Sequence, residues 1–164
     1  MNMYFHLRAV PPAALRNSTA WLQRLFEDDW DTVRRRLDLN REELLDNHYL
    51  DHDRLYACTP PHHVETGPWG DVVLGGRPVF PADRDRPPFL VLTAARTARV
   101  AAFLAKADFD ALWRPARDSL LPRYGGLEAE PQTRCAFASA HRDLTAFYTR
   151  TAESGDAVVK WLVH

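Results

Sequence analysis

The sequence lacks the features that assign a chain to a secreted, membrane or nucleic-acid-binding class. It has two cysteines, Cys58 and Cys135, without the Cys-x-x-Cys spacing of zinc or redox sites. No apolar run approaches the ~20 residues that span a bilayer, and the first residues lack the basic start and apolar core of a signal peptide. The net charge of −1 provides no long-range attraction to nucleic acid or anionic lipid. We therefore expect a cytoplasmic protein with reduced thiols, and neither nucleic acid nor membrane among its partners.

Lysine is also scarce, and the chain has 2 lysines and 19 arginines. Coding bias in a GC-rich genome explains this most simply, because the arginines are scattered among acidic residues. An arginine-rich binding surface is the alternative. The 46% hydrophobic and 26% charged residues are typical of a globular protein. The length predicts one domain covering residues 1–164.

Hydrophobic patterns predict four strands. Residues 3–10 alternate and indicate a strand with one buried face, and short strands are expected at 72–74 and 89–92. Residues 157–163 are apolar on both faces and predict a strand inside the sheet. Only Lys160 interrupts this pattern, and we expect its side chain to reach toward the edge of the sheet.

About six helices are expected, in runs that do not alternate with strands. Ser18 or Asn17, Thr93 and Asp108 are predicted to cap three of them. Residues 41–57 are predicted to be helical, with a break near Asn47, and the longest helix covers about 131–153. Pro115 is expected to kink or split its helix. These elements predict an α+β fold with a small mixed sheet of about four strands covered by about six helices.

The region 48–65 concentrates side chains that bind metals or transfer protons. His48 and His52 lie four residues apart and share a face of a helix. His62, His63 and Glu65 follow on a loop and could supply further ligands to a metal that activates water. The pattern lacks the His-Glu-x-x-His spacing of zinc enzymes, so a polar helix surface is favoured. We expect no bound metal and no cofactor.

Two further residues are candidates for a binding site. Trp69 stands between Pro68 and Gly70 in a long predicted loop, 58–70, where an exposed tryptophan would be a binding anchor. The alternative is that its ring folds back onto the core. His141 lies on the apolar face of the longest helix. It is interpreted as a core histidine bonded to a backbone group, or as a site residue whose pKa is shifted by burial.

Five segments together carry a resemblance to a known family. They are MYFHLRAV at 3–10, YLDHDRLY at 49–56, VVLGG at 72–76, FLVLT at 89–93 and GDAVV at 155–159. In this order the chain resembles the YfbM-like family, a domain of unknown function (1877). Asn2, Tyr56 and Thr59-Pro60 depart from the family pattern. The resemblance implies a small α+β fold with no established enzyme activity, and transfers no catalytic residues.

The sequence thus favours a domain that works by binding a partner, most simply another protein, in a regulatory or immunity-type role. This interpretation rests on three features of the chain: a substantial predicted hydrophobic core, a near-neutral net charge and no catalytic signature. The alternative is a small enzyme or metal-binding protein that uses the His/Asp-rich region 48–65.

Overall fold

The computed structural model describes residues 3–57 and 67–163, and it is built around a five-stranded sheet. The strands are β1 (Tyr4–Val10), β2 (Glu42–Leu45), β3 (Arg77–Val79), β4 (Phe89–Leu92) and β5 (Ala157–Val163). Their order is β2-β1-β5-β4-β3, and every neighbouring pair is antiparallel. The predicted α+β fold is confirmed, with five strands instead of about four.

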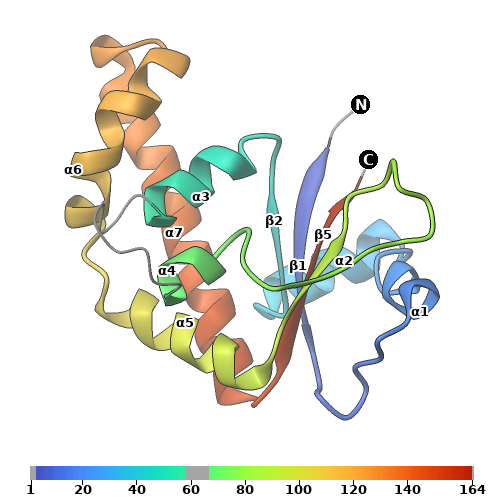
Figure 1. Ribbon diagram of the computed structural model, residues 1–164. Coiled ribbons are helices and arrows are strands. Elements are labelled where there is room, and N and C mark those ends of the chain that lie inside the picture. The colour runs from blue at the N-terminus through green and yellow to red at the C-terminus, as the bar shows by residue number, and fades with distance from the viewer. Residues whose placement is uncertain (1–2, 58–66, 164) are drawn as a thin grey trace.

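Helices cover both faces of this sheet (Figure 1). One face carries α3 (Tyr49–Ala57), α4 (Pro68–Asp71), α5 (Ala94–Lys106), α6 (Phe109–Leu120) and α7 (Glu130–Glu153). The other face carries α1 (Thr19–Arg24) and α2 (Trp30–Asp38). Two short 3-10 turns, Leu121–Arg123 and Leu127–Ala129, join α6 to α7.

The helix boundaries follow from local chemistry. The side chains of Ser18, Thr93 and Asp108 accept hydrogen bonds from backbone N–H groups in the first turns of α1, α5 and α6, as predicted. Asp29 caps α2 in the same way. Gly155 follows α7 with a φ of 69°, the left-handed conformation that ends many helices.

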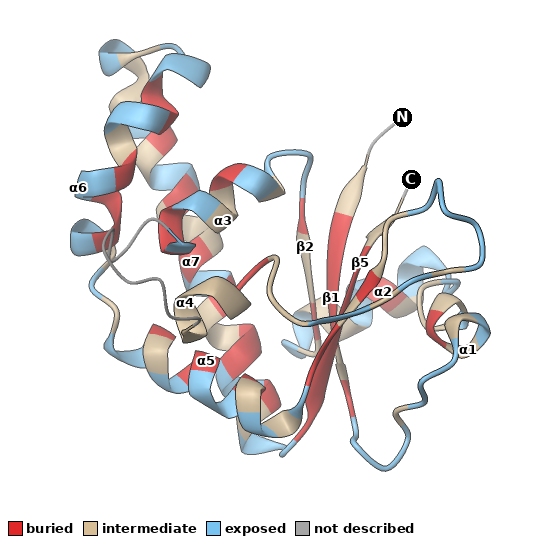
Figure 2. Ribbon diagram, in the orientation of Figure 1, coloured by how far each residue is buried: buried red, intermediate tan, exposed pale blue. Residues whose placement is uncertain are grey.

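Because β5 lies inside the sheet, its alternate side chains enter two separate hydrophobic cores. Val158 packs toward α5 and α7, while Val159 and Trp161 pack toward α1. The Trp161 ring stacks on Phe89 with centroids 4.7 Å apart and is 8% exposed. The predicted position of residues 157–163 is therefore confirmed, and β1 and β5 are buried over most of their length (Figure 2).

The prediction of a helical segment at 41–57, with a break near Asn47, is wrong in its first part. Residues 42–45 form β2, which pairs with β1 so that Phe5 faces Leu45 and Arg8 faces Glu42. The helix begins only at Tyr49, after a turn at the predicted break. Pairing with β1 outweighs local helix propensity here. β1 itself is buried on both faces, and not on one face as predicted, because helices cover both faces of the sheet.

Three other expectations are also corrected. Residues 72–74 form a turn after α4, and the strand begins at Arg77. Pro115 lies inside α6 without splitting it. Lys160 does not reach the edge of the sheet, because it is fully buried and its Nζ donates to the backbone carbonyls of Asp71 and Gly75.

The turn from Asp71 to Gly75 encloses the Lys160 ammonium group. A Cβ atom on Gly75 would collide with the Asp71 backbone, so only glycine permits this close return of the chain. Burial lowers the pKa of Lys160 to about 7, although the charges of Asp71 and Asp53 oppose the shift. The sheet thus contains a buried amine that titrates near neutral pH.

Candidate functional site

A cleft of about 400 Å³ lies between β2, the start of α3 and α7. It is formed by β2, the turn before α3, α3 and α7, and Tyr4 and Tyr124 also line it. The other lining residues are Glu43, Leu44, Leu45, Asp46, His48 and His52 on the β2–α3 side, and Ala136, Phe137, Ser139, Ala140 and Asp143 on α7.

Glu43 faces the cleft because of its register in the sheet. It pairs with Leu7 of β1, which places its side chain on the same face of the sheet as α7. Burial raises the pKa of the Glu43 carboxyl to about 7, and the charge of Asp143 adds to the shift. The Leu44 N–H, which donates to Glu43 Oε1 at 3.0 Å, opposes it. Glu43 therefore exchanges a proton near neutral pH.

The two predicted histidines of α3 both line this cleft. Asp46 accepts a hydrogen bond from the His48 backbone N–H at 2.8 Å and so shapes the turn that leads into α3. The His48 ring lies on Tyr124 with centroids 5.2 Å apart, and the His52 ring lies on Phe137 at 4.7 Å. Burial lowers the pKa of His52, so this imidazole is neutral at pH 7.

The cleft is acidic in a protein that is rich in arginine. Glu43, Asp46 and Asp143 supply three carboxyl groups, and none of the lining residues is Arg or Lys. Within residues 3–57 and 67–163, no ion pair involves any of these three carboxyl groups. No group of three His, Cys, Asp or Glu side chains in that part of the chain is arranged to hold a metal ion. The arrangement suits an organic cation, or proton transfer by Glu43.

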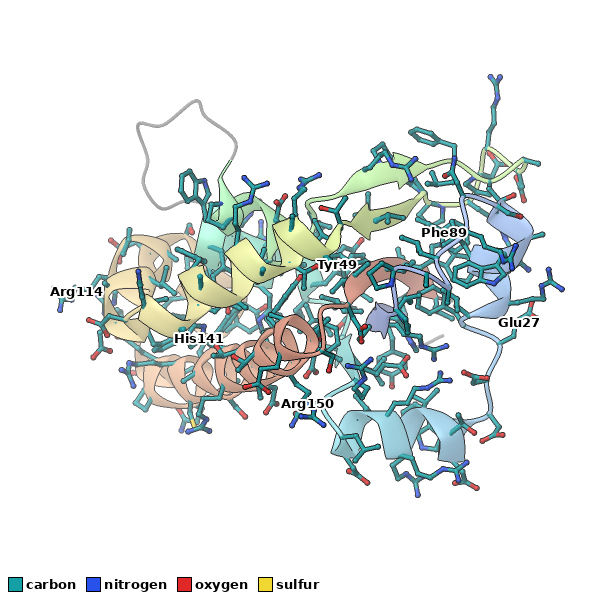
Figure 3. The ribbon with its side chains drawn as sticks, turned by 90° about the horizontal axis from the view of Figure 1, so that it is seen from below. Glu27, Tyr49, Phe89, Arg114, His141 and Arg150 are labelled. Carbon is teal, nitrogen blue, oxygen red and sulfur yellow. The ribbon has the colours of Figure 1, made fainter. Side chains whose placement is uncertain are left out.

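His141 does not join this site. Its Nδ1 shares a hydrogen bond with the Tyr56 hydroxyl at 2.9 Å, and its ring lies beside Phe109. Burial lowers the pKa of His141, which favours the neutral ring. Figure 3 shows His141 on α7 within the helical layer. The interpretation as a core histidine fits this position, but its partner is a tyrosine hydroxyl and not a backbone group.

Trp69 lies on α4, and not in an irregular loop. Its side chain is half-buried, packs against the larger core and meets the edge of Phe103 with ring centroids 6.5 Å apart. The predicted loop residues His62, His63 and Glu65 lie outside the described residues. Of the candidate site residues that it describes, the structure therefore brings together His48 and His52 only.

Sequence reasoning missed the acidic residues of the cleft. Glu43 fell within the predicted helix, and Asp143 is one of two exposed acids on α7. A usable signal does exist, because Ala136, Ala140 and Asp143 recur at helical spacing. Small residues along one helix face followed by an acid indicate a shallow groove with a charge at its end.

These features define a small α+β domain with helices on both faces of an antiparallel sheet and an acidic cleft between sheet and helix. The chain belongs to the family described as Domain of unknown function (DUF1877), whose model matches residues 1–161. The fold resembles the crystal structure of YfbM from Escherichia coli, a protein of unknown function, with 17% sequence identity and a TM-score of 0.59. The match covers 99% of this chain and 100% of that one. No curated protein matches the chain in sequence.

Proposed function

We propose that the protein acts by binding another protein, and that the cleft between β2, α3 and α7 receives a cationic side chain of this partner. The observation that carries the proposal is the set of three carboxyl groups, Glu43, Asp46 and Asp143, in a cleft without a lining cation. A guanidinium or ammonium group that enters the cleft gains charge-assisted hydrogen bonds. A regulatory or immunity-type role fits such a domain.

The walls of the cleft suit the rest of a long cationic side chain. Leu44 is partly exposed and offers apolar surface for its methylene groups. Tyr124 is also partly exposed and offers an aromatic ring for a cation. Arginine fits best, because its planar group binds a carboxylate through two hydrogen bonds and also stacks on aromatic rings.

The proposal also covers the number of domains and the cellular location of the protein. Both hydrophobic cores rest on one sheet, which supports a single domain as the functional unit. In the described part of the chain, no helix is both long and apolar enough to cross a membrane. A cytoplasmic location is part of the proposal, and the free thiol of Cys135 suits a reducing compartment.

The test is affinity capture with a matched pair of variants. The wild-type protein and Asp143→Asn are used as bait, and Asp38→Asn on the exposed end of α2 is the control with the same change of charge. A partner retained by wild type and Asp38→Asn, and weakened about tenfold or more by Asp143→Asn, supports the proposal. A partner held equally by all three baits contradicts it.

A small enzyme is the second candidate, and the raised pKa of Glu43 favours it. A carboxyl group with a pKa of about 7 beside the Asp143 carboxylate can serve as a general acid or base at neutral pH. The test is a panel of chromogenic ester, glycoside and phosphate substrates. Turnover that is lost in Glu43→Gln and kept in Asp38→Asn supports this candidate. Turnover that survives in Glu43→Gln places the reaction elsewhere.

A further inference from the structure

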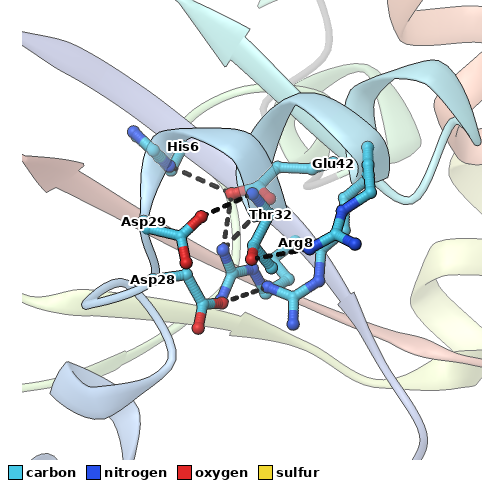
Figure 4. Close-up of polar contacts among 8 residues, drawn as sticks. His6, Arg8, Asp28, Asp29, Thr32 and Glu42 are labelled. Atoms are coloured by element: carbon cyan, nitrogen blue, oxygen red, sulfur yellow. Dashed lines mark hydrogen bonds and ion pairs between the residues drawn. The ribbon is translucent and has the colours of Figure 1, made fainter.

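A second polar site lies on the opposite face of the sheet, under α1 and α2. Arg8 of β1 is almost fully buried, and its Nη2 donates to both carboxylate oxygens of Glu42 at 2.9 and 3.0 Å. Its Nη1 donates to Asp28 at 3.0 Å, and His6 Nδ1 lies 3.1 Å from Glu42 (Figure 4). The strand register that pairs Arg8 with Glu42 places this group on the α1 side of the sheet.

One donor in this site has no partner. Arg8 Nε is buried without a hydrogen bond, and this is rare because an unsatisfied buried N–H is costly. Burial lowers the pKa of Arg8 even though Glu42 and Asp28 favour its charge. The cost of burying the guanidinium group thus outweighs the favourable charges of Glu42 and Asp28 in this shift.

Arg8 also lines a cavity of about 290 Å³ together with two more arginines. Arg36 comes from α2, and Arg41 precedes β2. Trp21, Leu25 and Pro11 are among the apolar lining residues. Among the described residues, no Asp or Glu lines this cavity, and the carboxylates that pair with the three arginines lie outside its lining. Three guanidinium groups beside an indole ring form a surface for an anion with an apolar part.

Asp28 shows how a carboxylate is held here. Its Oδ2 accepts hydrogen bonds from both Arg8 and Arg36. A single oxygen thus bridges two guanidinium groups, while other donors of the same arginines remain for a further anion. Arg36 and Arg41 are partly exposed, with side-chain exposures of 36% and 25%, so an anion can reach them from solvent.

We propose that this cavity binds a small organic anion, a carboxylate or a phosphate monoester, whose apolar part lies against Trp21 and Leu25. The anionic group contacts the guanidinium groups of Arg8, Arg36 and Arg41. The site is separate from the acidic cleft, which lies on the other face of the sheet, and it does not depend on the function proposed for that cleft.

The test uses benzoate and phenyl phosphate as probes, with benzyl alcohol as the uncharged control and inorganic phosphate as the control without an apolar part. Binding is followed by NMR through the Trp21 indole N–H and by calorimetry. We expect both aromatic anions to shift the Trp21 signal more than either control does. Comparing the affinities of benzoate and phenyl phosphate then shows whether the site prefers a carboxylate or a phosphate ligand.

Variants decide whether the arginines carry this binding. Arg36→Gln and Arg41→Gln are expected to weaken the probes about tenfold or more, whereas Arg36→Lys, which keeps the charge, weakens them less. Arg34→Gln on the exposed face of α2 is the matched control and leaves affinity unchanged. The proposal is overturned if neither aromatic anion binds to the wild-type protein, or if Arg36→Gln and Arg34→Gln bind them equally well.

Discussion

The two faces of the sheet each bury one cation, and they stabilise it in different ways. On the α1 and α2 side, Arg8 is held by the carboxylates of Glu42 and Asp28. On the α5 and α7 side, Lys160 is held by the backbone carbonyls of Asp71 and Gly75. A full negative charge thus balances the first cation, and only carbonyl dipoles contact the second.

The difference follows from the shapes of the two side chains. A guanidinium group is planar and matches a carboxylate through two hydrogen bonds, whereas an ammonium group is compact and directs its donors to separate acceptors. The closed turn around Lys160 has room for the compact group only. This explains a buried lysine in a chain with 19 arginines and 2 lysines. It also makes the Lys160 side of the sheet the one that responds to pH.

The largest expected effect comes from breaking the pair on the α1 side. Arg8→Met leaves the fully buried Glu42 carboxylate without its partner, so we expect a loss of about 3–5 kcal/mol in the free energy of unfolding. Urea denaturation measures the loss. The double variant Arg8→Met with Glu42→Leu removes both charges and should regain most of it. A double variant as unstable as Arg8→Met alone would show that the pair does not act as a unit.

Removing the cation on the other face should cost less and depend on pH. Lys160→Met removes the hydrogen bonds that its Nζ donates to the Asp71 and Gly75 carbonyls, of which the Asp71 carbonyl keeps a contact with the Tyr148 hydroxyl at 3.3 Å. We expect a loss of about 1–3 kcal/mol near pH 9. The folded-state pKa of Lys160, about 7, lies below its ordinary value of 10.5. The unfolded chain therefore binds the extra proton between these two values, and this lysine's contribution to stability rises as pH increases through that window.

The stability gap between wild type and Lys160→Met should therefore widen from pH 7 toward pH 10. The matched control is Lys106→Met at the exposed end of α5, which should change stability by no more than about 0.5 kcal/mol at any pH. Denaturation series at several pH values measure both variants. A gap for Lys160→Met that does not change with pH would mean that Lys160 keeps its proton throughout.

Glu43→Gln should show the opposite dependence on pH with a smaller effect. The folded-state pKa of Glu43 is about 7 and its ordinary value is 4.5, so the folded protein binds the extra proton between them. The wild-type protein therefore loses stability as pH rises from 4.5 to 7, and Gln removes this loss. We expect the variant to be more stable by about 1–2 kcal/mol at neutral pH. If Asp38→Asn gives the same gain, the effect is general charge repulsion and not a property of the cleft.

The sequence predicts elements whose patterns are local, and fails where a distant partner decides. The caps at Thr93 and Asp108 and the buried strand at 157–163 are readable because each depends on neighbouring residues or on a simple apolar run. Residues 42–45 form a strand only because β1 lies beside them. Of the acidic cleft, His48 and His52 were predictable from their spacing. Glu43 was not, because its position depends on that same pairing.

The smallest effect expected concerns two tryptophans that are not fully buried, one on each side of the sheet. Trp69 on α4 is half-buried against Phe103, and Trp30 at the start of α2 is 53% exposed. Trp69→Ala should destabilise by about 1–2 kcal/mol, less than a fully buried tryptophan, because part of its ring already contacts solvent. Trp30→Ala should stay within about 0.5 kcal/mol.

We propose that Trp69 also contacts the protein partner. Its truncation should therefore lower the affinity for the captured partner, while Trp30→Ala leaves this affinity unchanged. Thermal melts and calorimetry with that partner measure both quantities. Equal affinity in the two variants would make Trp69 a purely structural residue, and a loss above about 3 kcal/mol would identify it as part of the core.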